Sequence, residues 1–480
     1  MNTKSLPQPL SGKKFSRSKE FWATVKYFTV LEIFFAVMMA SFNFGGKVVF
    51  GILIGIPPLI ALGTGSRKAY QFILYFICIL FAMGQRTIHI GHYFRIVPSA
   101  IILWGIAVVA LFTRPQFPST KKTLPWSVLI LSLSSALGIF IGFNNSQNVN
   151  LGFMYAHMMW MSIPAFLVAH RFAQRIEHIQ TIVNVLSMGC LFLSFLGIAE
   201  YYGLGFIRYF SGFIQGKTLS GQEEFTRMAA TFWGGPMMAG YISMCFPLIL
   251  AHFFSSKTMT QKGISLISLT LCFVAIYLSG HRGVWLPVLF SLIIYFYLKG
   301  IKGILYILIL ITIGIHFIPQ GAKTRLGGLY GEQRDSSSIK REGRAREAWE
   351  MIKENPVVGS GWGASGLVHS DFIQIWADAG FTAFSTFVWI YLMIFKRLLG
   401  VVKTHNKIFK EYCYGFFAAI LSTMGILLQQ TWLNLPELYT PFWFVMALAY
   451  QYPNIISIEN KIEFAYYQSA MGRVERNPNA

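Results

Sequence analysis

Charged residues are scarce in this sequence, and acidic residues are scarcer than basic ones. Of its 480 residues only 12% are charged, whereas 54% are hydrophobic. A soluble chain of this length would form two or three domains with charged surfaces, and the composition excludes that class. The 40 Lys and Arg residues against 19 Asp and Glu give a formal charge of +21. Because the basic residues are scattered between apolar runs, we expect no nucleic acid partner.

The sequence also lacks the motifs of metal and cofactor sites. Its five cysteines all fall in apolar segments without CxxC spacing, so neither a disulfide nor a metal site is indicated. No DxD pair is present to hold a divalent cation, and the lysine of a phosphate-binding GxxxxGK[ST] loop is missing. We therefore expect no metal and no cofactor.

Long apolar runs recur from Phe28 to Tyr450. A membrane-spanning helix needs about 20 apolar residues, because the hydrocarbon is about 30 Å thick and each helical residue rises about 1.5 Å. We predict an all-α fold, a polytopic transmembrane bundle of about 12 to 14 spans. Spans fill 27–317 and 371–452, on either side of one large loop at 318–370. The individual spans are predicted at 27–43, 48–63, 70–84, 97–113, 125–143, 150–169, 180–199, 236–254, 264–280, 283–298, 302–317, 371–395, 412–429 and 439–452.

The distribution of basic residues orients the chain. Cytoplasmic loops of membrane proteins carry the excess of Lys and Arg. With both ends inside, 25 of the 40 basic residues fall in inner segments. Residues 1–26 lack the apolar core and cleavage site of a secretory signal, so they and 453–480 are interpreted as cytoplasmic tails. Eight of the other 15 basic residues lie in the outer 318–370 loop, and this local exception indicates a function.

The first candidate site is the turn SGHRGVWL, residues 279–286, between two apolar runs. An arginine at a membrane surface is costly unless it is paired, so Arg282 indicates a functional site. The alternative is an interfacial arginine that reaches toward water, beside Trp285 in an aromatic belt.

The second candidate is a short amphipathic helix that begins near Arg341 and stops before Pro356. At about 100° per residue, Arg341 is in line with an apolar stripe and Arg344 lies at its edge, whereas Arg346 points away. The stripe consists of Ala345, Ala348, Trp349 and Ile352. Arg341 and Arg344 are therefore the better candidates for binding an anion. The alternative is a solvated, salt-bridged surface helix.

The third candidate is the glycine-rich loop over 356–370 and the helix that follows it. Four glycines within eight residues allow close approach to a ligand or partner. Asp371, Gln374 and Asp378 make a polar stripe on an otherwise apolar helix, and such stripes usually face a water-filled cavity. His369 stands at the entrance to this stripe, where a neutral imidazole can accept a proton from a sugar hydroxyl. The alternative is an interfacial, hydrogen-bonding histidine.

In their order along the chain, these segments resemble the O-antigen ligase and Wzy-type polymerase superfamily. The resemblance covers 279–393 and rests on SGHRGVWL, on AWEMIKENPVVGSGWG after the basic helix, and on HSDFIQIWADAGFTAF. HSD stands where HND is usual, and two arginines straddle the position where the family tends to have one. Upstream, Arg227 is similar to the family's outer arginine ahead of a small-residue-rich helix.

The resemblance implies a GT-C-like, metal-independent glycosyltransferase at the outer face of the bacterial cytoplasmic membrane. Its donor would be a glycan on undecaprenyl diphosphate, and its acceptor a saccharide or lipid A-core. It would act as an O-antigen or exopolysaccharide polymerase, as an O-antigen ligase, or on proteins. The catalytic candidates are His369, Arg282 and Arg344, and the substrate-binding candidates are Arg341, Arg227, Arg346, Asp371 and Gln374.

The residues themselves favour the same chemistry. Planar arginine forks bind the negative oxygens of a diphosphate and would stabilise it as it leaves. The alternative is a polyprenol-glycan flippase or another polytopic transporter. A transporter would tend to show an internal duplication or two discontinuous spans in matching halves, and neither is evident in the sequence.

We expect a single cysteine near residue 335, placed in a cysteine-free background, to react with a membrane-impermeant thiol reagent. The charge distribution puts the 318–370 loop outside and both termini inside. The measurement compares labelling before and after permeabilisation, with a cysteine in 1–26 as the control that reacts only afterwards. Labelling near 335 only after permeabilisation would reverse the orientation.

Overall fold

Helices dominate the residues that the structure, a computed structural model, describes. These are residues 75–79, 81, 88–90, 94–96, 98–112, 124–145, 149–204, 230, 232, 235–300, 336–366, 368–404, 406–430, 432 and 435–476. The predicted helical class is confirmed, with one small addition. β1 (Ile88–Ile90) pairs antiparallel with β2 (Phe94–Ile96) in a two-stranded sheet.

With one exception, the helices agree in place with the apolar runs of the sequence. The helices are α4 (Pro98–Phe112), α5 (Trp126–Asn144), α6 (Val149–Trp160), α7 (Ser162–Phe172), α8 (Ile176–Tyr201), α9 (Gly235–Ser255), α10 (Met259–Leu278), α11 (Arg282–Lys299), α14 (Ser336–Glu354), α15 (Asp371–Val402), α16 (Lys407–Leu427) and α17 (Pro436–Arg476). The exception is α14, which is the predicted amphipathic helix, and it begins at Ser336 rather than near Arg341. Within the described residues, six segments are long and apolar enough to cross a membrane. The chain is therefore a polytopic helical membrane protein. The tail 1–26 and the spans predicted at 27–43, 48–63 and 302–317 lie outside the described residues, so the total count stays a prediction.

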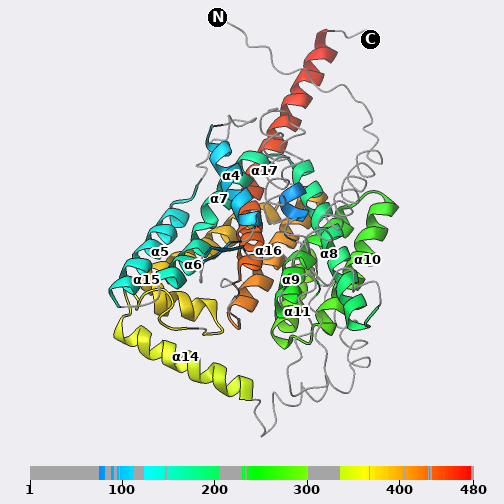
Figure 1. The fold of residues 1–480 in the computed structure, drawn as a ribbon. Coiled ribbons are helices and arrows are strands. Elements are labelled where there is room, and N and C mark those ends of the chain that lie inside the picture. Colours follow the sequence, from blue (N-terminus) through cyan, green and yellow to red (C-terminus); the bar gives the residue numbers. More distant parts are fainter. Residues whose placement is uncertain are drawn as a thin grey trace, which may run out of the picture.

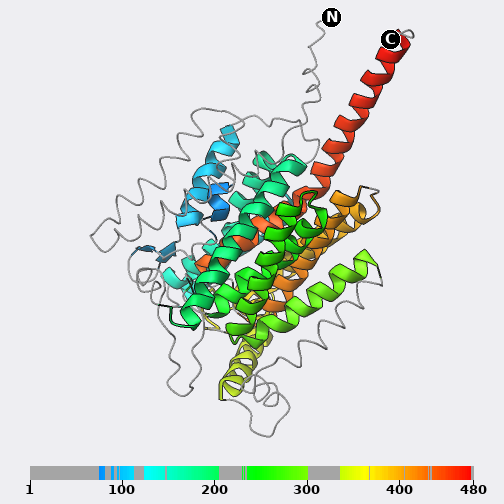
Figure 2. The same cartoon turned by 90° about the vertical axis from the view of Figure 1, so that its right-hand side faces the viewer.

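The last helix is longer than the predicted span. α17 has 41 residues and continues past residue 452, so the tail predicted over 453–480 is helical as far as Arg476. The apolar run ends earlier, but the residues that follow include good helix formers such as Glu459 and Lys461. At about 1.5 Å per residue α17 is about 60 Å long, roughly twice the hydrocarbon thickness. Its C-terminal part extends beyond the bundle, at the end opposite to α14 (Figures 1 and 2).

The core is built around α9, which is buried along most of its length. It packs against α16, α10, α8 and α11. Glycines on α16 allow close approach, because a methyl group at Gly415 would lie 2.6 Å from the Cβ of Ala251 on α9. One at Gly425 would lie 3.0 Å from Pro287 on α11. Such small-residue contacts are typical of helices that pack within a membrane, and they hold the end of α16 beside α11.

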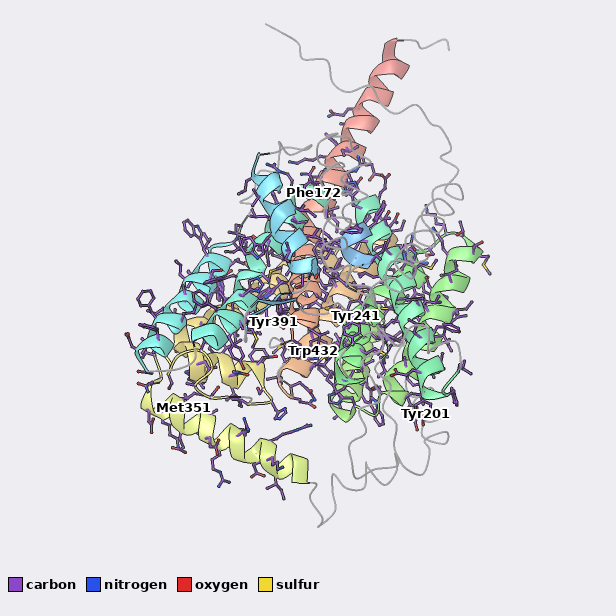
Figure 3. All side chains as sticks on the ribbon, in the orientation of Figure 1. Phe172, Tyr201, Tyr241, Met351, Tyr391 and Trp432 are labelled. Atoms are coloured by element: carbon purple, nitrogen blue, oxygen red, sulfur yellow. The ribbon has the colours of Figure 1, made fainter. Side chains whose placement is uncertain are left out.

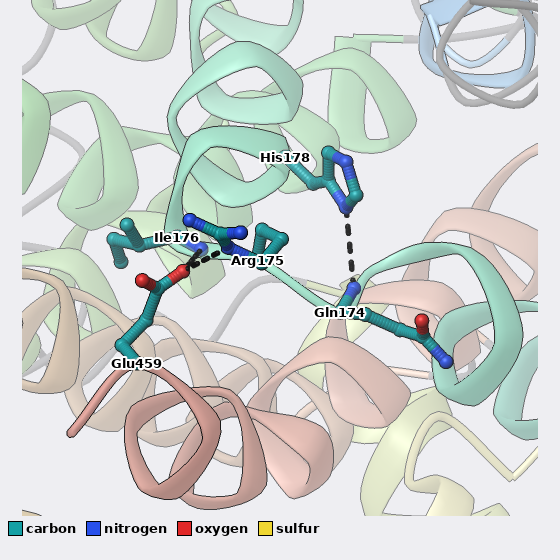
Figure 4. A network of polar contacts seen from close by, with 5 residues as sticks. All are labelled: Gln174, Arg175, Ile176, His178 and Glu459. Carbon is teal, nitrogen blue, oxygen red and sulfur yellow. Dashed lines mark hydrogen bonds and ion pairs between the residues drawn. The ribbon is translucent and has the colours of Figure 1, made fainter. Parts of the chain in front are cut away.

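A polar network fixes α17 to the start of α8 (Figure 4). Nε of Arg175 lies 2.6 Å from Oε1 of Glu459, and the same oxygen accepts a hydrogen bond from the backbone N–H of Ile176 at 3.2 Å. Glu459 thus satisfies one of the backbone donors that a helix leaves free at its N-terminus. Farther along the chain, Arg397 of α15 donates to the side-chain oxygen of Asn454 at 2.8 Å. α17 is therefore tied by polar side chains to both α8 and α15.

Candidate functional site

The glycine-rich loop between α14 and α15 is held by a buried carboxylate. Oδ2 of Asp378 accepts a hydrogen bond from the backbone N–H of Gly363 at 3.1 Å, and Oδ1 accepts one from Ser365 at 2.9 Å. The Asp378 side chain is fully buried. The loop glycines at 359, 361, 363 and 366 all have positive φ, a region that side chains rarely adopt, which explains why glycine occupies them. Asp378 therefore fixes the conformation of the loop.

A break in α15 supplies further acceptors for the same loop. Gly380 has φ 78° and ψ 178°, which interrupts the helical hydrogen bonding. The carbonyls of Ala377 and Asp378 accept the backbone N–H groups of Ser360 and Gly361, each at 2.9 Å. No side chain fits at Gly380, because it would meet the backbone of Val357. The loop and the break in α15 therefore form one unit.

Trp362 anchors the loop in the bundle on the other side. Its backbone N–H donates to the carbonyl of Gly138 at 3.1 Å, and its indole N–H donates to the carbonyl of Ser135 at 2.9 Å. The ring stacks on Tyr155 of α6 at a centroid distance of 5.8 Å. Space for the indole exists because Gly138 has no side chain, since a methyl group there would lie 2.8 Å from the ring. Trp362 is only 1% exposed, so the loop is inserted between α5 and α6 rather than lying on them.

The predicted polar stripe on α15 faces protein loops. Gln374 donates from Nε2 to the carbonyl of Gly366 at 2.9 Å. Oδ2 of Asp371 accepts the backbone N–H of Trp432 at 2.6 Å. Trp432 lies inside the bundle (Figure 3), against Gly240 of α9. The stripe is thus buried by the glycine-rich loop and the segment after α16 instead of facing a water-filled cavity, and substrate contact by Asp371 or Gln374 stays a prediction.

His369 closes the loop just before α15. It has φ 57°, an uncommon left-handed conformation for a residue other than glycine. The next residue, Ser370, caps α15 by accepting a hydrogen bond from the backbone N–H of Ile373 at 3.5 Å. Partial burial lowers the pKa of the His369 imidazole from its usual 6.5, and the positive charges of Arg341 and Arg344 lower it further. The imidazole is therefore neutral near pH 7 and able to accept a proton.

The arginines of α14 lie as the helical projection predicts. Ala348 and Ile352 are buried against α15, where Trp349 also makes an edge-to-face contact with Trp376 at 5.8 Å. Arg344 is directed toward the glycine-rich loop, since a methyl group at Gly366 would lie 3.2 Å from its Nη1.

Arg346 is directed away from that loop. Its side chain is 77% exposed, and its Nη2 lies 3.8 Å from Oε1 of Glu342 on the same helix. The positions of Arg344 and Arg346 agree with the predicted phase, and the charges of Arg341 and Arg344 both lower the pKa of His369.

The SGHRGVWL segment forms a rigid turn that begins α11 at Arg282. The hydroxyl of Ser279 donates to the carbonyl of Ile276 at 2.7 Å, and the indole N–H of Trp285 donates to the same carbonyl at 3.1 Å. Gly280 has φ 64° and allows the chain to reverse. Arg282 is the first residue of α11, whereas Arg227 lies outside the described residues.

Two polar residues near this turn are absent from the prediction. Gln429 and Gln430 follow α16, and both side chains approach Gly283. The sequence feature that could have indicated them is an adjacent pair of amides, which begins two residues after the end of α16, a 21-residue helix rich in apolar residues. Among the described residues, no group of three or more His, Cys, Asp or Glu is placed to hold a metal ion.

Comparison with known families decides the relationship of this region. The sequence profile described as O-antigen ligase matches residues 267–388, which include the turn at α11, the arginines of α14, His369 and the break in α15. This match makes residues 267–388 similar to O-antigen ligases. The chain is thus a polytopic membrane protein that contains a segment similar to O-antigen ligases.

Similarity to another protein extends along most of the chain. An uncharacterized protein of Haemophilus influenzae is 23% identical over 406 residues, which cover 77% of this chain and 95% of that protein. The similarity to this protein therefore extends well beyond the length of the segment at 267–388.

We expect Arg344→Ala to lower glycan transfer by about tenfold or more, because a charge-assisted contact contributes about 1.5–3 kcal/mol. Arg346→Ala is the matched control and should be mild, since its guanidinium points to solvent. The measurement is the initial rate of transfer by purified variants that have the same melting temperature. An inactive Arg346→Ala beside a normal Arg344→Ala would contradict the assignment.

Proposed function

We propose that this protein transfers a glycan from undecaprenyl diphosphate to a saccharide hydroxyl at the outer face of the cytoplasmic membrane. It would act as an O-antigen or exopolysaccharide polymerase, or as an O-antigen ligase with lipid A-core as acceptor, without a metal ion. The observation that carries the proposal is the position of Arg344 against Gly366, in the loop that ends at His369. Partial burial and the charges of Arg341 and Arg344 lower the pKa of the His369 imidazole, and the segment matches the O-antigen ligase model. This arrangement supports a role for His369 as the base for an acceptor and for the arginines as cations that bind a diphosphate.

The reaction needs one proton acceptor and one site for developing negative charge. His369 removes the proton of the acceptor hydroxyl as its oxygen bonds to the anomeric carbon of the donor sugar. The bond between that carbon and the diphosphate oxygen breaks, and undecaprenyl diphosphate leaves with the electron pair. Arg344 and Arg341, with Arg282 at the start of α11, would stabilise this charge by bidentate hydrogen bonds. The diphosphate is already a good leaving group, so no general acid is required.

The arrangement of the site favours a transferase over a flippase. Transporters bind their substrates near the middle of the bilayer, between structural repeats. Here Arg341, Arg344 and His369 lie where α14 meets the loop before α15, and α14 lies at one end of the bundle (Figure 1). A site at one end suits chemistry at one membrane face.

Transfer is tested by incubating purified protein with an undecaprenyl-diphosphate-linked oligosaccharide and a saccharide acceptor, in EDTA and without ATP. We expect extended glycan and free undecaprenyl diphosphate in equal amounts. Acceptors of the polymerase and ligase types, offered separately, distinguish the two activities. Movement of the lipid-linked glycan across a vesicle membrane, without any product, would instead establish the flippase.

We expect His369→Ala to reduce transfer by about 10²- to 10⁴-fold while donor binding is retained, as is typical for loss of a general base. The wild-type kcat/KM for the donor, which reports the substrate-free protein, should rise with pH to a plateau, with its midpoint below 6.5, because burial and the arginines lower the pKa of the imidazole. Arg341→Ala should move that midpoint upward. A normal rate for His369→Ala would remove the base from the mechanism.

A further inference from the structure

Three polar side-chain ends gather around Gly283, in the first turn of α11. A methyl group at Gly283 would lie 2.9 Å from Nε2 of Gln430, 3.3 Å from Nε2 of His281 and 3.5 Å from Oε1 of Gln429. The two glutamines come from the segment after α16, and His281 from the turn before α11. Polar groups from two separate parts of the chain therefore meet where glycine leaves room for them.

The amide of Gln430 has unused hydrogen-bonding capacity. Its Nε2 atom is buried and has no hydrogen-bond acceptor among the described residues. A buried polar group without a partner costs about 1–3 kcal/mol, so it is seldom kept without a role. An amide nitrogen donates two hydrogen bonds, and its own oxygen accepts two. Together with the oxygen of Gln429, this provides donors and acceptors that carry no net charge.

A short hydrogen bond joins the segment that carries Gln430 to the start of α15, close to His369 in the sequence. Asp371 lies two residues after His369, and Trp432 lies two residues after Gln430. Oδ2 of Asp371 accepts the backbone N–H of Trp432 at 2.6 Å, and both residues are only 2% exposed. The loop that carries the base and the segment that carries the glutamines are therefore fixed side by side, with Gly283 in the first turn of α11 against the glutamines.

We propose that Gln429 and Gln430 form a saccharide-binding subsite, in which Gln430 donates to a sugar hydroxyl or ring oxygen beside the reacting bond. The proposal rests on the proposed function and adds residues that bind the sugar rather than the diphosphate. Sugar hydroxyls are neutral and both donate and accept hydrogen bonds, so they match amides, whereas diphosphate is matched by guanidinium groups. The sugar bound can belong to the donor or to the acceptor, and the measurements below separate these two cases.

The test uses two substitutions that change the cluster in different ways. Gln430→Ala removes the amide. Gly283→Ala keeps it but places a methyl group against it, and the flexible end of Gln430 has to move away. Alanine is favourable inside a helix, so Gly283→Ala should not unfold α11. Gly263→Ala on α10 is the matched control, because a methyl group there meets no atom within 4 Å.

We expect both substitutions to weaken saccharide recognition by about three- to tenfold, the size of one or two hydrogen bonds. The readouts are the KM for the acceptor, the affinity for undecaprenyl-diphosphate-linked glycan, and the affinity for undecaprenyl diphosphate without a glycan. A higher KM for the acceptor assigns the subsite to the acceptor. A lower affinity for undecaprenyl-diphosphate-linked glycan assigns it to the donor. The affinity for undecaprenyl diphosphate without a glycan and the pH midpoint set by His369 should stay unchanged.

Two outcomes overturn this subsite. Weaker binding of glycan-free undecaprenyl diphosphate would show that the amides bind the diphosphate. Unchanged saccharide recognition in both variants, beside an active wild-type protein, would show that they bind no sugar. A wild-type protein that binds the lipid-linked glycan no better than the glycan-free lipid, and transfers nothing, would overturn the proposed function itself.

Discussion

The buried carboxylate of Asp378 is the group on which the candidate site depends most. Its two oxygens receive backbone N–H groups of the glycine-rich loop, beside the break at Gly380 where α15 offers free carbonyls. Trp362 then inserts the same loop between α5 and α6. His369 follows directly, so the place of the base is set by contacts that reach into the bundle core. A base held in this way needs little rearrangement before it accepts a proton.

The positive charge around His369 has two effects in the proposed reaction. In the absence of substrate, Arg341 and Arg344 lower the pKa of the imidazole and keep it neutral. A bound diphosphate would offset those charges, and the pKa of His369 would rise again because an anion favours the imidazolium. The base would then become stronger when the donor is in place. Arginines that bind the leaving group would thereby also couple donor binding to proton transfer.

The parts of the fold that follow from local pattern could be predicted from the sequence. Apolar runs located the helices because bilayer thickness sets their length, and the helical period placed Arg344 toward the loop and Arg346 away from it. Local pattern showed that Asp371 and Asp378 share a helix face, but it could not show what covers that face. Trp362 and its acceptor Ser135 are 227 residues apart, and such contacts leave no periodic signal. Gln430 could not be predicted for the same reason, because its neighbour Gly283 is far away in the sequence.

In the proposed reaction, the packing of α14 has a consequence for the release of product. α14 packs mainly on α15, through Ala348, Ile352 and Trp349, and most of its other side chains face solvent. A helix held by so small an apolar contact separates from its neighbours at a lower free energy than the bundle unfolds, and its amide hydrogens exchange sooner. The loop that carries His369 is fixed on both sides and does not share this freedom. Local opening of α14 would thus weaken the binding of undecaprenyl diphosphate, the proposed product. The loop that carries His369 would keep its conformation for the next turnover.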